Sequence, residues 1–253
     1  MASLSDEAFE ERMRNFVAHN PSPRNPRISK DSSYADRIEE AYQADGHSTW
    51  GYVIYRTTYE SEADWTEFMR RLRAWTEDGM EICNGQDVLD QMAWTIFDDR
   101  ERFDGADVAT IRRHFRAWAE TAAQSEQPRR PDGAPAGMGR SPRYRYCIQI
   151  DAEALKSCVH DAPPPPEIDD DKRGWVKMIE KDWMLRSEDP RWAGRELDTT
   201  AYEAIDGVTA YNVGWLKCPF RSVMTEYYML FQDPNAYTVD YRRPPRITGW
   251  PWT

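Results

Sequence analysis

Charged side chains stand where two predicted strands end. Arg56 ends the run "WGYVIYR" and Glu60 follows it, while Asp98 and Asp99 end the run "MAWTIFDD". In parallel sheets, ligands favour the carboxyl ends of the strands, because the loops converge there. The aspartates could bind a guanidinium or an amine, and Arg56 could orient a carbonyl or a phosphate. The alternative interpretation of this rim is a surface salt bridge between strand ends.

A third predicted strand, "RYRYCIQID" at 143–151, carries further candidates. Its residues alternate, so Tyr146 belongs to one face and Cys147 to the other, which we expect to meet solvent or a polar cavity. Asp151 and Glu153, at the end of this strand, could add to an acidic pocket or cap the turn that follows. A half-buried or buried thiol is expected for Cys147, because a reactive thiolate needs a base or a positive field.

Arginines recur on or beside the exposed faces of two predicted helices. If the helices are neighbours, these side chains form one basic surface that could meet phosphates. An ordinary solvated face that pairs with Glu67, Glu77 and Glu120 is the alternative. The arginines are Arg70, Arg71 and Arg73 on the first helix and Arg112, Arg113 and Arg116 on the second.

The two helices belong to a repeated pattern. "FMRRLRAWTE" at 68–77 and "IRRHFRAWAE" at 111–120 are offset by 43 positions, and Val53 and Ile96 in the preceding strands share that offset. The pattern predicts a repeated strand-helix unit. Right-handed crossovers between parallel neighbours would then place both helices on one side of the sheet. Convergence of two amphipathic helices is the alternative.

The remaining segments complete an α+β prediction. We expect a mixed sheet of about four or five strands, with helices mainly on one face. Further strands are predicted within 174–183 and 207–218, and a late helix at 219–233. We expect residues 1–45 to form N-terminal helices and a linker, and 46–253 to form a single domain. Ala-, Gly-, Pro- and Ser-rich composition predicts a mobile loop at 120–142, and four prolines beside an acidic run predict another at 160–173. We expect the C-terminal tail to be extended.

Composition restricts the partners and cofactors. The net charge of −11, from 44 acidic and 33 basic side chains, should repel polyanions. DNA is therefore not an expected partner, and an RNA would need a local basic patch. The four cysteines show no CxxC spacing and the four histidines are scattered, so neither a metal nor another cofactor is expected. No segment has the apolar length of a membrane span, and reduced thiols fit a cytoplasmic protein.

Several phrases resemble a widespread family of short hypothetical fungal proteins. These are "WGYVIYRTTY", the helix "RRHFRAW", and "RYRYCIQID" with the Pro- and Asp-rich insert that follows it. The resemblance covers roughly residues 48–245 and rests on the order and texture of the segments. Arginine-containing cyclodipeptide synthases are one activity attached to fungal proteins of this size. The resemblance implies arginyl-tRNA as a substrate and two acyl transfers that close a diketopiperazine ring.

That chemistry implies roles for the residues above. Two acyl transfers need a base for each attacking amine, donors for the developing oxyanion and an acidic pocket for the guanidinium. The catalytic candidates are Arg56, Glu60, Asp98, Asp99 and Tyr146; the substrate-binding candidates are Tyr55, Asp151 and Glu153; the tRNA-binding candidates are Arg70, Arg73, Arg113, Arg116, Arg129 and Arg130, with Arg140 in the same loop.

A non-catalytic interaction module is the rival hypothesis. The acidic composition fits it equally well, and the tail "RRPPRITGWPWT" could dock on a partner in extended form. An enzyme should show a concave, partly dry pocket where titratable groups converge. A binding module should instead show a flat or grooved face with solvated charges.

Overall fold

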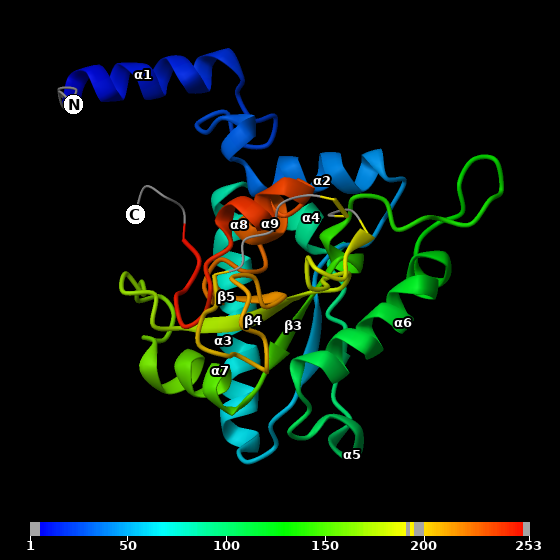
Figure 1. The fold of residues 1–253 in the computed structure, drawn as a ribbon. Coiled ribbons are helices and arrows are strands. Elements are labelled where there is room, and N and C mark those ends of the chain that lie inside the picture. Colours follow the sequence, from blue (N-terminus) through cyan, green and yellow to red (C-terminus); the bar gives the residue numbers. More distant parts are fainter. Residues whose placement is uncertain (1–5, 191–192, 195–199, 250–253) are drawn as a thin grey trace.

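The computed structural model describes residues 6–190, 193–194 and 200–249. A five-stranded sheet lies at the centre in the order β2-β1-β3-β4-β5 (Figure 1). β2, β1 and β3 are parallel, and β4 and β5 continue the sheet antiparallel. The predicted α+β class with a mixed sheet of four or five strands is confirmed. The strands are β1 Val53–Arg56, β2 Ile96–Phe97, β3 Tyr146–Ile150, β4 Trp175–Glu180 and β5 Trp215–Pro219.

Helices surround this sheet. The longest, α3 and α6, follow β1 and β2, as the repeated pattern predicts. The α-helices are α1 Asp6–His19, α2 Tyr34–Ala44, α3 Glu62–Ile82, α4 Gln86–Leu89, α5 Arg100–Phe103, α6 Val108–Glu126, α7 Ala152–Lys156, α8 Glu226–Leu230 and α9 Pro234–Asp240. Short 3-10 turns lie at Lys30–Ser32 and Pro142–Tyr144, and a π-helical turn at Ser157–Asp161.

The helices α3 and α6 pack on opposite faces of the sheet. Phe68 of α3 shares a core with Ile54 and Ile148, whereas Phe115 of α6 shares a second core with Val53. The prediction that both helices lie on one side is therefore wrong. Most of the other helices, namely α2, α4, α7, α8 and α9, contribute to the core of α3, and α5 contributes to that of α6.

Strand order explains this arrangement. The chain crosses from β1 to β2 in one direction, and then from β2 back past β1 to β3 in the other. Right-handed crossovers that run in opposite directions must use opposite faces of the sheet. The offset of 43 positions still has a counterpart in the structure: Val53 and Ile96 each lie on the face opposite to the helix that follows them.

The predicted loop at 120–142 starts too early. α6 continues to Glu126, because Ala119, Ala122 and Ala123 pack against Tyr144. Alanine is the strongest helix former and is small enough to allow this close contact. A segment that we predicted to lack an apolar face therefore has a narrow one made of methyl groups.

Other boundaries also shift. The π-helical turn that ends at Asp161 shortens the predicted loop at 160–173, and the late helix at 219–233 is reduced to α8. α2 buries Ala35 and Ile38 in the same core as the sheet. No helix in the described part of the chain is long and apolar enough to cross a bilayer.

Because α3 and α6 pack on opposite faces of the sheet, we expect substitutions in their two cores to change stability independently. We expect Phe68→Leu and Phe115→Leu each to lower the free energy of unfolding by about 0.5–3 kcal/mol, and the double variant to equal their sum within about 0.5 kcal/mol. The sheet separates the two rings, so they share no packing partner. Urea unfolding of the four proteins measures this. A coupling above about 1 kcal/mol would mean that the two helices pack against each other.

Candidate functional site

Arg56 is the buried centre of an ion cluster at the carboxyl end of β1, and the carboxylates around it reach the surface. Its side chain is only 3% exposed, and its Nη2 lies 2.6 Å from Glu62 Oε2. Nη1 lies 3.3 Å from Asp98 Oδ2, and Nε donates to Thr58 O at 3.1 Å. Burial opposes the charge, but the bonds to Glu62 and Asp98 outweigh it and raise the pKa of Arg56. This is the salt bridge between strand ends that was the alternative interpretation.

Aromatic rings enclose the same guanidinium. Its carbon lies 4.4 Å from the ring centre of Tyr59 and 4.9 Å from that of Trp65. Burial, and then the neighbouring Asp98, raise the pKa of Tyr59, so its hydroxyl stays protonated. Because rings and carboxylates already hold it, Arg56 is a structural cation rather than a ligand for a carbonyl or phosphate.

A histidine that the sequence analysis did not select pairs with Tyr55 on the other face of β1. The Tyr55 hydroxyl lies 2.7 Å from His114 Nδ1 on α6. Burial raises the pKa of Tyr55, so this hydroxyl is neutral. Nε2 of His114 has no partner among the described residues and is not enclosed, so it reaches the surface. Nε2 carries a free lone pair in the tautomer in which Nδ1–H donates to the phenol oxygen.

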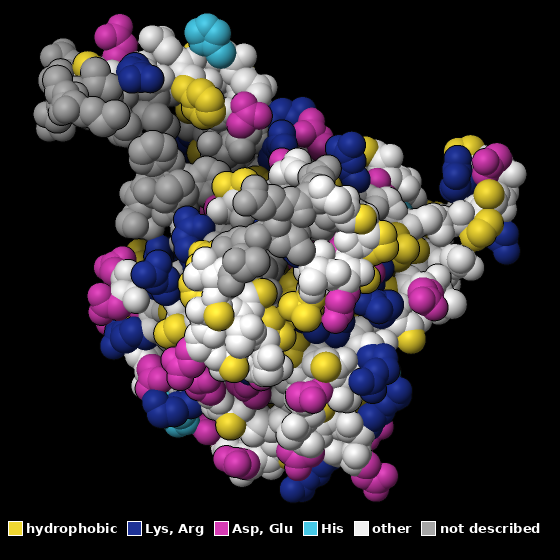
Figure 2. Space-filling model, in the orientation of Figure 1, with side chains coloured by type: hydrophobic (Ala, Val, Ile, Leu, Met, Phe, Trp, Pro, Cys, Tyr) yellow, Lys and Arg dark blue, Asp and Glu magenta, His cyan; other side chains and the backbone are white. Residues whose placement is uncertain are grey.

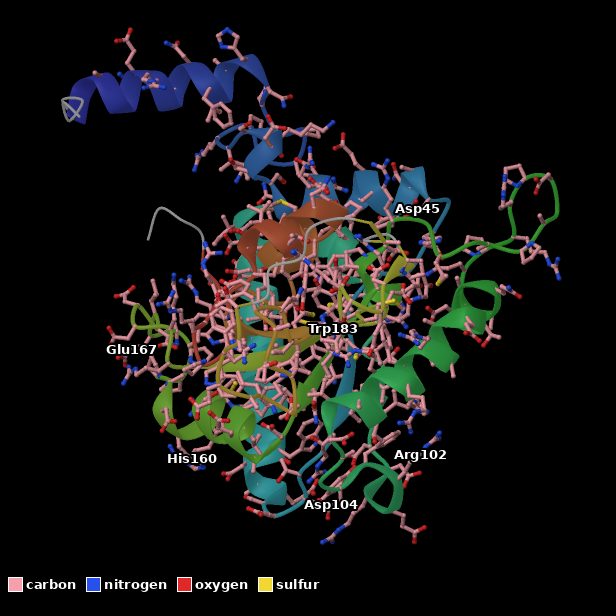
Figure 3. The ribbon with its side chains drawn as sticks, viewed as in Figure 1. Asp45, Arg102, Asp104, His160, Glu167 and Trp183 are labelled. Atoms are coloured by element: carbon pink, nitrogen blue, oxygen red, sulfur yellow. The ribbon has the colours of Figure 1, made fainter. Side chains whose placement is uncertain are left out.

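The surroundings of His114 keep it neutral. Its ring centre lies 4.8 Å from that of Phe97 and 5.1 Å from that of Phe103. Burial, and then the charge of Arg102, lower the pKa of His114 below its ordinary 6.5. Arg102 is exposed beside α5, where Figure 3 labels it. A neutral imidazole with a free nitrogen is suited to general base catalysis.

Gln149 closes the sheet beneath this pair. It is 2% exposed, and its Nε2 donates to Ala106 O at 2.8 Å and to Thr57 Oγ1 at 3.2 Å. These bonds fix the loop between α5 and α6 to the end of β1. Its Oε1 is buried and has no hydrogen-bond partner within the described part of the chain. The polar face predicted for β3 is present, but it is covered.

The acidic pair at the end of β3 is neutralised. Asp151 caps α7 by accepting from Ala154 N, and its Oδ2 lies 2.6 Å from Lys177 Nζ. Glu153 Oε1 lies 2.9 Å from Lys217 Nζ. The predicted substrate-binding carboxylates therefore serve as a helix cap and as partners of the half-buried Lys177 and the buried Lys217.

Tyr146 lies away from the rim. It is at the amino end of β3 and stacks on Tyr237, with ring centres 5.0 Å apart. Because strands β1 and β3 are parallel, this end of β3 is opposite to the end that carries Arg56. The prediction that Tyr146 belongs to the same catalytic group is wrong. Cys147 is fully buried, and burial raises the pKa of its thiol, which fits the inert thiol that we expected.

The other two candidates at the rim, Asp99 and Glu60, have different surroundings. Asp99 caps α5 by accepting from Arg102 N through Oδ1 at 3.2 Å. Glu60 is exposed, and Glu62 instead takes the place beside Arg56. Glu62 stands in the first turn of α3, where the chain turns back over the strand end. In the sequence, the signal for this contact is a carboxylate in the first turn of the helix that follows the strand.

The arginines of α3 and α6 do not form one surface, because the two helices lie on opposite faces. On α3, Arg70 and Arg71 both bond Glu67, and Arg73 lies 5.0 Å from the ring centre of Trp94. Arg71 is buried and also donates to the carbonyls of Cys158 and Ala162. The prediction of one continuous basic surface across the two helices is therefore wrong.

The remaining arginines follow α6 and the loop after it. Arg113, Arg129, Arg130 and Arg140 are exposed. Arg129 donates to Gly133 O, Arg130 lies 3.7 Å from Asp132, and the Arg140 backbone N–H bonds Asp45. Arg112 and Arg116 instead turn toward the end of β4.

Glu67 provides a pH prediction. Its bonds to Arg70 and Arg71 lower the pKa of Glu67 to about 2, against 4.5 for an ordinary glutamate. A carboxyl whose pKa is lower in the folded state contributes stability above pH 4.5 and loses it as the pH falls toward 2. We expect the urea midpoint of Glu67→Gln to fall less than that of the wild type in this window. Glu77→Gln is the matched control on α3, and equal slopes for Glu67→Gln and wild type would contradict the prediction.

Among the described residues, no group of three or more histidine, cysteine, aspartate or glutamate side chains could hold a metal ion. His114 was not predicted from the sequence because its partner Tyr55 is 59 residues away. The only local signal was a polar ring beside the apolar face of α6, in "RRHFRAW". No protein-family model, no curated protein and no solved structure matches this chain.

Proposed function

We propose that this protein is an aminoacyl-tRNA-dependent acyltransferase that forms an arginine-containing cyclodipeptide. The observation that supports this proposal most directly is the position of His114. Its neutral imidazole contacts Phe97, and Asp98 and Asp99 follow Phe97 directly at the rim of the sheet. The candidate base thus lies beside the strand that ends in two carboxylates, although Asp98 turns toward Arg56 on the other face, and the exposed cation of Arg102 follows in α5.

His114 would move the protons in both acyl transfers. In the first, the α-amine of one aminoacyl group attacks the ester carbonyl of the other and gives a proton to Nε2. A C–N bond forms, the C–O bond to the ribose breaks, and the imidazole returns the proton to the ribose oxygen. In the second, the remaining free amine attacks the second ester in the same way. Ring closure then releases the second tRNA.

Tyr55 would act as a positioning residue. Its side chain is fully buried, so it reaches the substrate only through His114. The phenol oxygen fixes the imidazole orientation, a role that the third member of a catalytic triad also has. Arg102 would supply positive charge near the developing oxyanion, where a cation is worth more than in bulk water.

The carboxylates of the rim fit an arginyl side chain. Asp98 remains 41% exposed although it bonds Arg56, and Asp99 uses Oδ1 for its cap. Carboxylates recognise a guanidinium through paired, charge-assisted hydrogen bonds. The cluster around Arg56 shows the same recognition between residues of this chain, with two carboxylates and two rings around one guanidinium.

A basic strip supports the tRNA part of the proposal. Arg113 stands next to His114 in the sequence of α6, and Arg129 and Arg130 follow in the loop after the helix; all three are exposed. Lysine and arginine side chains lie along the right side of Figure 2, where Figure 1 shows α6, and on the loop that projects beyond it. Phosphates could follow this strip toward His114 despite the negative net charge.

The structure weakens one argument for the rival hypothesis of an interaction module, namely a tail that is free to dock on a partner. The tail does not stand free over its described length: Ile247 pairs with Lys217 of β5, and Thr248 N–H donates to Lys217 O at 2.8 Å. Arg243 and Thr248 are buried. Residues 250–253, which complete the predicted docking segment, lie outside the described residues.

The test is product formation from charged tRNA. The full chain is incubated with total yeast tRNA, aminoacyl-tRNA synthetases, ATP and labelled arginine, and cyclic dipeptides are sought by mass spectrometry. We expect a labelled diketopiperazine that disappears after ribonuclease treatment. A reaction without the protein controls for spontaneous cyclisation. Absence of product, together with no binding of arginyl-tRNA, would reject the proposal.

A further inference from the structure

A buried cation lies on another side of α6, at the end of β4. Arg112 is 8% exposed and donates to Glu180 O at 3.0 Å and to Gly214 O at 2.9 Å. Among the described residues, no carboxylate lies within ion-pair distance of it, and Glu180 acts on it only at longer range. A buried charge without a close counterion is costly, and arginine cannot relieve this by losing its proton.

A second guanidinium stands one helical turn further on. Arg116 donates from Nη2 to Lys181 O at 2.9 Å, and Asp182 is 3.9 Å away at the limit of an ion pair. Its enclosed Nε has no hydrogen-bond acceptor among the described residues. Nη1 of Arg112 and Nη1 of Arg116 also donate to no described residue, so both guanidinium groups keep N–H donors on this side of α6. Paired guanidinium groups of this kind bind phosphate oxygens.

Gly214 creates the space for this arrangement. Its φ of +80° is strained for a residue with a side chain, and an added Cβ would lie 2.4 Å from Arg112 Nη2 and 2.4 Å from Trp183 Cδ2. The Arg112 guanidinium lies 4.8 Å from the ring centre of Trp183. Trp183, labelled near the centre of Figure 3, is half-buried. The cation thus has an aromatic neighbour.

Two exposed tyrosines stand on the chain segment that leads to Gly214. Tyr211 is 43% and Tyr202 is 36% exposed, and their ring centres are 5.6 Å apart. Tyr211 also contacts Tyr241, whose hydroxyl accepts from Val213 N at 2.9 Å. Through this bond and the ring contact, Tyr241 fixes the segment that runs from Tyr211 to Gly214. Large exposed rings that are fixed in place offer stacking surfaces for bases.

We infer that Arg112, Arg116, Trp183, Tyr202 and Tyr211 form a nucleotide-binding site, in which the guanidinium groups hold a phosphate and the rings stack on a base. Phosphate-binding arginines interleaved with stacking rings are the chemistry by which proteins hold unpaired nucleic acid. A free mononucleotide and the single-stranded 3′ end of an RNA share this chemistry. The inference needs no catalysis and does not rest on the proposed function.

The test measures binding to the full chain without turnover. The probe is the RNA trinucleotide CCA with a 5′ fluorophore, followed by fluorescence polarisation, with AMP and inorganic phosphate as competitors. We expect saturable binding that Tyr211→Ala weakens by about 5- to 100-fold, the usual range for one stacked base. Arg116→Gln should weaken binding and lower the slope of log affinity against log salt by about 0.7. These side chains are at least partly exposed, so both variants should fold.

Matched controls and competitors decide the outcome. Phe16→Ala removes an exposed ring of α1, 45% exposed, and Arg173→Gln an exposed arginine; both should bind like the wild type. CCA binding more tightly than AMP would identify an RNA end as the ligand, and equal binding a free mononucleotide. The inference fails if neither binds, if Tyr211→Ala and Arg116→Gln behave like the controls, or if inorganic phosphate competes as well as AMP.

Discussion

His114→Asn is expected to lower the rate of cyclic dipeptide formation by about 100-fold or more, the usual contribution of a general base. Asparagine keeps a polar group near the Tyr55 hydroxyl but cannot accept the proton of the attacking amine. The measurement is the rate of labelled diketopiperazine formation at saturating arginyl-tRNA. Circular dichroism and urea unfolding of the same variant establish that the fold is retained.

The pH profile should identify the same group. Burial and Arg102 hold the pKa of His114 below 6.5, and only the deprotonated imidazole is a base. The wild-type rate should therefore rise with pH through that pKa and level off above 6.5, while the residual rate of His114→Asn lacks this step. His160→Asn is the control, because His160 is exposed and bonds only Asp64, at 3.0 Å, among the described residues. A wild-type rate for His114→Asn would refute its role.

Arg143→Met is expected to lower the free energy of unfolding by about 3–5 kcal/mol, because it leaves buried partners without their cation. Arg143 is fully buried, and its Nε and Nη2 bond both oxygens of Glu126, at 2.6 and 2.8 Å. Nη1 donates to Gly51 O at 2.8 Å, and Nη2 donates to Thr95 Oγ1 at 2.8 Å. This one side chain therefore joins the last turn of α6 to the segments that enter β1 and β2.

Urea unfolding measures this effect. Arg130→Met is the control, since Arg130 is exposed and its contact with Asp132 is 3.7 Å long; we expect a change within about 0.5 kcal/mol. The double variant Arg143→Met, Glu126→Gln should recover part of the loss, because the unpaired carboxylate is removed as well. A loss below about 1 kcal/mol for Arg143→Met would show that the network is not needed for folding.

Local patterns in the sequence were sufficient for the elements and their buried faces. Phe68 and Leu72 recur at helical spacing and are buried in α3, as predicted. In β3, Ile148 and Cys147 alternate between the two faces, as predicted, but both faces lie in apolar cores, whereas we expected the Cys147 face to meet solvent or a polar cavity. These predictions succeed because helix and strand periods are properties of neighbouring residues. They fail at α6, where a face of alanines is too weakly apolar to show a period.

The tertiary structure alone decided which elements meet. Helical period shows that α3 and α6 each bury one face, but strand order determines the side of the sheet, and no local pattern encodes that order. The same limit applies to the candidate site. Arg56 was visible at the rim, yet its neutralisation by Glu62 and Asp98 depends on how the chain turns after two strands. The pairing of Tyr55 with His114 arises only when α6 crosses the sheet, because contacts between distant segments depend on packing rather than on sequence spacing.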